Sequence, residues 1–152
     1  ILGRGILGTV RVADRNIDLV EWEKIWYPSD DIPDTYRCNY VVEAKVEGLE
    51  EKLKAEGKPV RKSFFSRKVV DFKWKGEELA QSLGSDTELR SFLLSQRRPS
   101  KVEIEPWKEH QCVRIRPKRY TDSPEAAFPT VEAFEAYDRI AQHIRSIANV
   151  RP

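Results

Sequence analysis

The chain has 152 residues, of which 39% are hydrophobic, 10% aromatic and 34% charged. This composition is typical of one globular domain and excludes an intrinsically disordered chain. The net charge is only +2, because 27 basic residues are interleaved with 25 acidic ones, and we therefore expect no nucleic-acid partner. The sequence contains no run of about 18 apolar residues, the length that a membrane-spanning helix needs.

The first residues differ in character from the rest of the chain. Ile1 stands where a natural chain begins with Met, and Met is absent from the whole sequence. Residues 1–7 are apolar and interrupted by glycines, so we expect a linker or juxtamembrane stub that follows an upstream segment. We expect residues 8–149 to form a single α+β domain.

The first part of this domain predicts β-strands. Residues 8–13 and 17–27 are rich in alternating apolar side chains and flank a turn signal, which predicts a hairpin. The alternation slips at Leu19-Val20, where we expect a β-bulge or a strong twist. After a loop rich in Pro and Asp, residues 36–46 alternate cleanly and predict a third strand.

The middle of the chain predicts further strands around a charged segment. Residues 48–57 are mostly charged and predict an exposed excursion from the sheet. Residues 60–65 and 68–74 predict two extended pieces, and residues 101–105 and 112–117 predict a second hairpin.

Three helices complete the prediction. Residues 76–83 predict the first, and the capping box of Ser85 with Glu88 begins a second that runs through Gln96. A third, long helix over residues 131–149 is capped by Thr130. Its apolar stripe must be buried against another element, and we expect that element to be the sheet. The predicted fold class is α+β: a mostly antiparallel twisted sheet with two short helices and one long C-terminal amphipathic helix packed on one face.

Cysteine and histidine give no metal signature. Cys38 and Cys112 fall within predicted strands, and we expect buried, reduced thiols, with a disulfide between them left open. His110 and His143 stand at spacings unrelated to the cysteines, unlike the ligands of a zinc site. We therefore expect neither a structural metal nor a cofactor.

One pattern indicates an enzyme. Asp34 follows a proline, and Glu43 and Lys45 share a strand face, so the three resemble the PD-(D/E)xK signature of metal-dependent nucleases. In that family the two carboxylates hold a divalent cation while the lysine helps to activate water. An ordinary solvated strand face shows the same residue types, and the nuclease function is kept as an alternative to it.

A second set of residues indicates a binding surface. Arg114 and Arg116 share an outer strand face opposite Glu103 and Glu105, which predicts cross-strand ion pairs. Basic side chains after this strand and aromatic side chains at strand ends remain as candidates for contact with a ligand, lipid headgroup or partner. The candidates are Trp26, Tyr27, Trp107, Arg116, Lys118 and Arg119.

From about Gly8 to Ile147 the order of elements resembles the soluble part of small, archaeal-type membrane-anchored proteins of unknown function. The segments that carry the resemblance are Gly8-Thr9-Val10, Val69-Val70-Asp71-Phe72 leading into Glu78-Leu79-Ala80, Glu88-Leu89-Arg90-Ser91-Phe92-Leu93-Leu94, and Tyr137-Asp138-Arg139-Ile140-Ala141. The resemblance implies a membrane-tethered context and no catalytic residue.

These observations favour a binding or assembly module without catalytic activity, in a membrane-anchored protein. The partners expected are the membrane, through an upstream segment, and a protein partner or a second copy. The location expected is membrane-associated, on a side that the sequence does not define. The alternatives are the nuclease domain and a lipid- or small-ligand-binding module.

Overall fold

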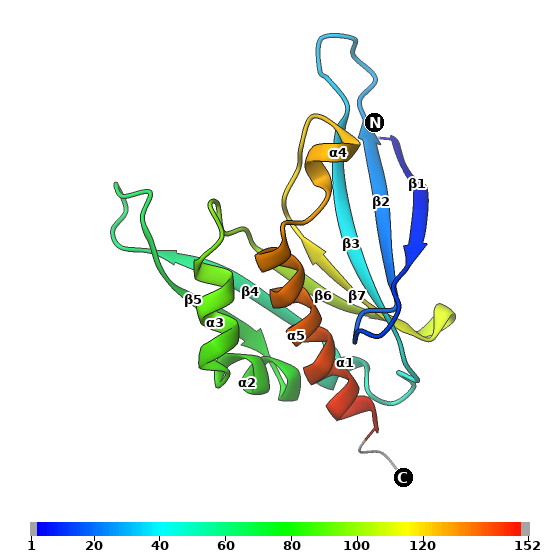
Figure 1. The fold of residues 1–152 in the computed structure, drawn as a ribbon, viewed down its shortest axis with the longest axis vertical. Helices are drawn as coiled ribbons and strands as arrows, with labels where there is room; N and C mark the ends of the chain where they lie inside the picture. The colour runs from blue at the N-terminus through cyan, green and yellow to red at the C-terminus, as the bar shows by residue number, and fades with distance from the viewer. Residues whose placement is uncertain (1–2, 150–152) are drawn as a thin grey trace.

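The computed structural model describes residues 3–149 and shows an α+β fold (Figure 1). Its centre is a seven-stranded antiparallel sheet with the strand order β1-β2-β3-β7-β6-β4-β5. The strands are β1 (Gly3–Arg11), β2 (Leu19–Trp26), β3 (Thr35–Glu43), β4 (Ala55–Arg61), β5 (Val69–Gly76), β6 (Val102–Trp107) and β7 (Cys112–Pro117). The predicted fold class is confirmed.

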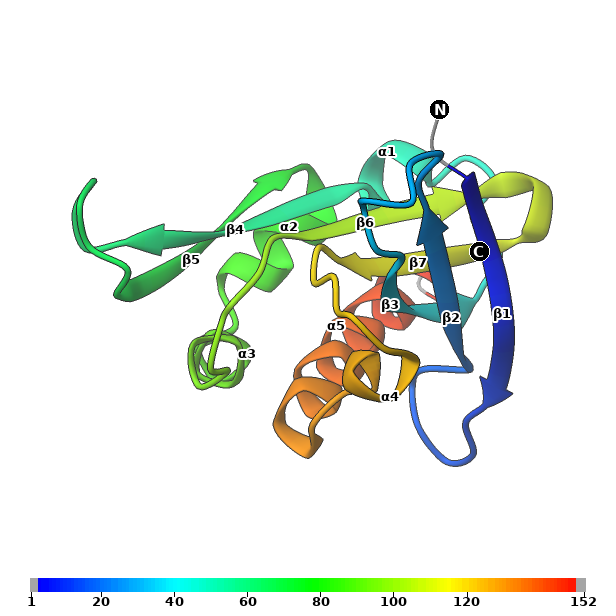
Figure 2. The same ribbon diagram turned by 90° about the horizontal axis from the view of Figure 1, so that it is seen from above.

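The main helices lie on one face of this sheet, which twists so strongly that β1–β3 and β4–β5 run in very different directions (Figure 2). Helix α5 packs against β3 and β7, while α2 and α3 pack against β5 and against α5. The helical elements are α1 (Glu50–Leu53), α2 (Glu78–Gly84), α3 (Thr87–Leu94), the 3₁₀ turn η1 (Lys108–His110), α4 (Pro124–Ala127) and α5 (Val131–Asn149).

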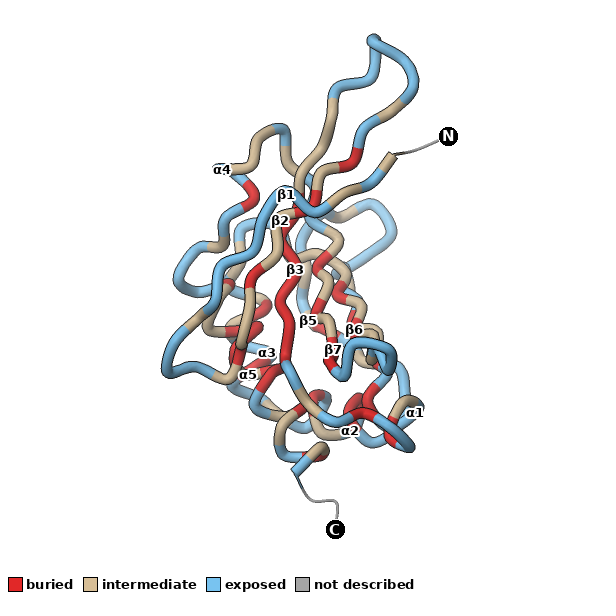
Figure 3. Tube along the Cα trace, turned by 90° about the vertical axis from the view of Figure 1, so that its right-hand side faces the viewer, coloured by how far each residue is buried: buried red, intermediate tan, exposed pale blue. Residues whose placement is uncertain are grey.

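The core lies between α5 and the middle of the sheet. Ile140 and Ile144 of α5 are fully buried, and the ring of Tyr137 stacks on that of Tyr40 in β3 with centroids 4.5 Å apart. Figure 3 shows the buried residues running along β3 and β7 beneath the helix. Burial of each such side chain stabilises the fold by about 1.5–3 kcal/mol, so α5 is the main source of apolar contact for the central strands.

The bounds of α5 agree with the sequence prediction, and Thr130 is its cap: the Thr130 hydroxyl accepts a hydrogen bond from the Ala133 amide at 3.2 Å. The predicted capping box of α3 is wrong. Ser85 belongs to the end of α2, where its hydroxyl donates to the Gln81 carbonyl, and Asp86 caps α3 instead. Asp86 has the extended backbone that an N-cap needs.

The predicted linker is corrected for residues 3–7. These residues form the first half of β1 and pair with β2 from Gly3 opposite Trp26 to Ile6 opposite Glu23. Glycines weaken the strand pattern here, yet Gly3 is required, because a Cβ at this position would clash with the Trp26 ring. Residues 1–2 lie outside the described part. A β-bulge falls in β1 between Ile6 and Gly8, whereas Leu19 and Val20 pair with β3 without a shift of register, so the bulge expected as one alternative at Leu19-Val20 is absent.

Residues 48–57, predicted as an exposed excursion from the sheet, are held to the core by two buried leucines. Leu49 and Leu53 are buried at either end of the short helix α1, and β4 begins immediately afterwards at Ala55. These two leucines were the only apolar edge in a charged stretch, and both enter the core. The sheet therefore gains a strand that starts earlier than the pattern indicates.

Cys38 in β3 and Cys112 in β7 are buried, free thiols, as the sequence predicts. The two strands are neighbours, but Cys112 stands opposite Glu43 at the far end of β3 from Cys38. Burial raises the pKa of both thiols, that of Cys38 to about 11. Both are therefore neutral and poorly reactive near pH 7.

A single carboxylate on α5 holds the turn between β1 and β2. Asp138 is buried and accepts hydrogen bonds from the backbone amides of Asn16 and Ile17 at 2.9 and 3.0 Å, and from the Asn16 side chain. We expect Asp138→Ala to lower the free energy of unfolding by about 3 kcal/mol, because it leaves buried amides without an acceptor. Urea unfolding followed by circular dichroism measures the change.

The matched control is Glu135→Ala on the same helix, which removes an exposed ion pair with Arg15. Exposed pairs contribute about 0–1 kcal/mol, so this variant should unfold close to the wild type. Equal losses in the two variants would show that Asp138 has no special role.

Candidate functional site

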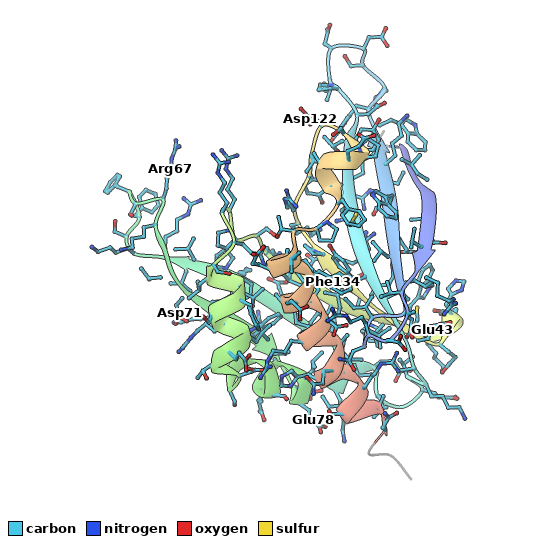
Figure 4. All side chains as sticks on the ribbon, viewed as in Figure 1. Glu43, Arg67, Asp71, Glu78, Asp122 and Phe134 are labelled. Carbon is cyan, nitrogen blue, oxygen red and sulfur yellow. The ribbon has the colours of Figure 1, made fainter. Side chains whose placement is uncertain are left out.

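The structure separates the predicted nuclease residues. Asp34 directly precedes β3 and pairs with Lys24 at 3.3 Å. Glu43, labelled in Figure 4, ends β3 and pairs with Arg11 at 2.7 Å. A strand rises about 3.3 Å per residue, so the two carboxylates lie about 30 Å apart. Lys45 follows the end of the strand. Within residues 3–149, no three acidic, Cys or His side chains are placed to hold a metal ion.

The predicted aromatic surface is also divided. Trp26 and Tyr27 lie at the end of β2, where Trp26 covers the first residues of β1. Trp107 lies at the opposite end of the sheet, with its ring against His110 at 4.0 Å and beneath the guanidinium of Arg114 at 5.0 Å. These aromatic side chains therefore cannot contact one small ligand together.

Two of the three predicted basic residues are occupied by ion pairs. Arg116 contacts Glu23 and Glu105, both at 3.3 Å, and Lys118 contacts Glu103 at 3.3 Å. The cross-strand pairing predicted for β6 and β7 is therefore present for Arg116. Arg119 differs, because no carboxylate pairs with it within the described residues.

The open face of the sheet carries a buried ionic network. Arg37 is fully buried and donates to both oxygens of Glu23, at 2.9 and 3.1 Å, and to the Tyr120 hydroxyl. Asn39 adds a further hydrogen bond to Glu23 at 3.2 Å. Burial alone would raise the pKa of Glu23, but these hydrogen bonds and the charges of Arg37 and Arg116 outweigh it and lower the pKa to about 2.

A chain of hydrogen bonds on the helical side has the composition of a catalytic triad. The Ser82 hydroxyl lies 2.6 Å from Nδ1 of His143, and Nε2 of His143 lies 2.7 Å from Asp86. Asp86 also accepts from the Leu89 amide and from Arg139 at 2.7 Å, so its oxygens are already engaged in capping α3 and in an ion pair. We interpret this set as a clasp that ties α2 and α3 to α5.

The most exposed apolar residues within residues 3–149 lie at the tip of the β4–β5 hairpin. Phe64 is 90% exposed and Phe65 93%, with ring centroids 5.2 Å apart. They are flanked by Arg61 and Lys62 before and by Arg67 and Lys68 after, with no acidic residue in residues 61–68. We call residues 61–68 the hairpin tip.

The hairpin holds this tip away from the body of the protein (Figure 1). Strand β4 pairs with β6 only from Ala55 to Gly57, so its remaining length has β5 as its only partner within the described sheet. The Lys62 amide donates to the Lys68 carbonyl at 2.8 Å and closes the turn. Figure 4 shows Arg67 directed outward from this end. The tip is therefore an ordered projection.

The opposite end of the same hairpin carries charges of both signs. A cavity of about 400 Å³ lies at its base, around Ala55 and Gly76. Its charged lining consists of Glu51, Glu56, Glu77, Glu103 and Glu105, with Lys54 and Lys75. Lysine or arginine side chains pair with Glu56, Glu103 and Glu105, so the base has no excess of charge comparable to that of the tip.

The hairpin tip is absent from the predicted site residues because residues 60–65 were assigned to a strand. The available signal was compositional: four basic residues surround two adjacent phenylalanines without an acidic neighbour. Such a segment is unsuited to a packed core and to a sheet interior.

Comparisons with protein-family models, with curated proteins and with solved structures found no match to this chain. Within residues 3–149, no helix is both long and apolar enough to cross a membrane.

The ionic network predicts a loss of stability in acid. The pKa of Glu23 is lower in the folded protein than the usual 4.5, so its contribution is present above pH 4.5 and is lost as the pH falls toward 2. This lowering of the Glu23 pKa corresponds to about 3 kcal/mol in the free energy of unfolding. We expect Glu23→Gln to lower the free energy of unfolding by about this amount at pH 7, and by much less near pH 2, in urea titrations.

Glu109→Gln serves as the control, since Glu109 is exposed at the β6–β7 turn. It should unfold like the wild type at both pH values. If the stability of Glu23→Gln depends on pH as that of the wild type does, Glu23 is not the cause of the loss of stability in acid.

The clasp predicts unequal effects of its members. We expect Asp86→Ala to lower the free energy of unfolding by about 2–3 kcal/mol, because α3 loses its cap and Arg139 and His143 lose their acceptor. Ser82→Ala removes one neutral hydrogen bond and should cost about 1 kcal/mol. Thermal and urea unfolding measure both. An ester-hydrolysing activity that Ser82→Ala abolishes would contradict the structural interpretation.

Proposed function

We propose that this domain is a membrane-associated binding module that contacts an anionic lipid surface through its hairpin tip. The observation that carries the proposal is the pair Phe64 and Phe65, almost fully exposed and surrounded by four cations without an acidic residue. Exposed apolar side chains ringed by charge mark an interaction surface.

The phenylalanine rings of the tip suit the apolar part of a bilayer, and its basic side chains suit the anionic headgroups. Transfer of a Phe side chain out of water is favourable by about 1.5–3 kcal/mol when the ring is fully buried. Each Lys or Arg near an anionic leaflet adds about 1 kcal/mol. The sum describes a weak, reversible attachment that needs both the rings and the charges, and that salt weakens.

The charge distribution favours one orientation. The basic tip points away from the body, and the cavity at the other end of the hairpin is lined by charges of both signs. An anionic surface attracts the tip more strongly than the base, so the domain would stand on the membrane with the base of the hairpin outward. In this orientation the base remains accessible to a protein partner, in keeping with a binding or assembly role.

Vesicle sedimentation tests the proposal. Wild-type protein should sediment with vesicles of phosphatidylcholine and phosphatidylglycerol, and much less with phosphatidylcholine alone. Phe64→Ser with Phe65→Ser should weaken binding at least about tenfold, the equivalent of 1.4 kcal/mol. Arg67→Gln with Lys68→Gln should weaken binding and reduce its dependence on salt.

Lys73→Gln with Lys75→Gln is the matched control, because both lysines are exposed on β5 away from the tip. This variant changes the net charge equally and should bind almost like the wild type. The proposal is overturned if the control loses as much binding as the tip variants. It is also overturned if single-stranded nucleic acid binds the tip while anionic vesicles do not.

A further inference from the structure

A basic cleft lies beside the N-terminus of α5. It shares no residue with the hairpin tip. Its volume is about 460 Å³. The lining comes from the α3–β6 connection, from the segment after β7 and from the start of α5. These residues are Gln96, Arg97, Arg98, Arg119, Tyr120, Thr121, Thr130 and Ala133, and none of them carries a carboxylate.

The arginines of this cleft have no acidic partner. Among the described arginines, eight have a carboxylate within ion-pair distance: Arg11, Arg15, Arg37, Arg90, Arg114, Arg116, Arg139 and Arg145. Arg97, Arg98 and Arg119 have no side-chain ion pair or hydrogen bond within residues 3–149, and the same holds for Arg4 and for Arg61 and Arg67 of the hairpin tip. The cleft is therefore the place where three such arginines line one cavity.

The segment after β7 is fixed in position. The Tyr120 hydroxyl accepts a hydrogen bond from buried Arg37 at 3.1 Å, which ties the Tyr120 side chain to the ionic network on the open face of the sheet. The Thr121 hydroxyl lies within hydrogen-bond distance of the carbonyls of Tyr36 and Ser123, at 3.1 and 2.9 Å. The cleft therefore has one rigid wall, formed by residues that follow β7.

Arginine guanidinium groups bind phosphate oxygens through two parallel hydrogen bonds, so three arginines can surround one phosphate group. The volume of the cleft accommodates a phosphate together with part of the group that carries it. The helix dipole of α5 adds to the positive potential there, and it is secondary to the arginines.

We propose that the cleft of Arg97, Arg98 and Arg119 binds a phosphate group, carried either by a lipid headgroup or by a small soluble molecule. This inference goes beyond the proposed membrane contact, because the cleft can bind soluble phosphate when no membrane is present. In the lipid case the α3–β6 connection rises on the same side as the hairpin tip (Figure 1), so both could face one surface.

NMR titration of the ¹⁵N-labelled protein with inorganic phosphate tests the cleft without lipid. Saturable shifts are expected at the amides of residues 96–98, 119–121 and 130–133. Arg119→Gln, and Arg97→Gln with Arg98→Gln, should each weaken this binding at least about tenfold. Arg61→Gln with Arg67→Gln, at the hairpin tip, is the control and should titrate like the wild type. Unaltered spectra elsewhere show that each variant is folded.

A second experiment identifies the molecule that carries the phosphate. Vesicles containing phosphatidic acid are compared with phosphatidylglycerol vesicles of equal surface charge. A preference for phosphatidic acid that Arg119→Gln removes identifies a lipid headgroup, while saturable phosphate binding without that preference identifies a soluble ligand. The inference is overturned if neither experiment shows saturable binding that depends on these arginines. Loss of vesicle binding in the Phe64 and Phe65 variants reports only on the tip, so the two proposals fail separately.

Discussion

The packing of α5 across the curved sheet is the constraint on which the other features depend. Ile140 and Ile144 bury its inner face, and Tyr137 stacks on β3. From the same helix Asp138 holds the β1–β2 turn. Arg139 and His143 hold Asp86, the cap of α3, and α3 in turn reaches the hairpin through an ion pair of Arg90 with Asp71 at 3.7 Å. The direction of the hairpin tip is thus set from α5 outward.

Much of this framework could be predicted from the sequence, because long periodic segments carry a strong signal. The bounds of α5, its Thr130 cap and the strand β7 agree with the prediction. The failures have physical reasons. The strand at residues 3–7 relies on glycines that make room for Trp26, and glycine lowers strand propensity. The order of β-strands in the sheet depends on long-range pairing that periodicity does not encode.

The candidate sites were harder to predict than the fold. Asp34 and Glu43 match a motif by spacing, but an extended strand separates them, so the motif describes no shared site. The arginine cleft collects residues from three segments, of which only Arg119 was singled out in the sequence. Arg116 and Lys118 were chosen with it, yet carboxylates neutralise both. A net charge near zero therefore says little about where unpaired charge remains.

In the proposed membrane contact, the hairpin tip enters the headgroup region of an anionic membrane. An environment-sensitive fluorophore on Ser63→Cys tests it most directly, since the two native thiols are buried. Addition of vesicles containing phosphatidylglycerol should shift its emission to the blue and protect it from an aqueous quencher. The same label on Glu51→Cys, beside the cavity at the base of the hairpin, should remain exposed to the quencher. A tip label that stays fully accessible while the protein is bound to vesicles would contradict the account.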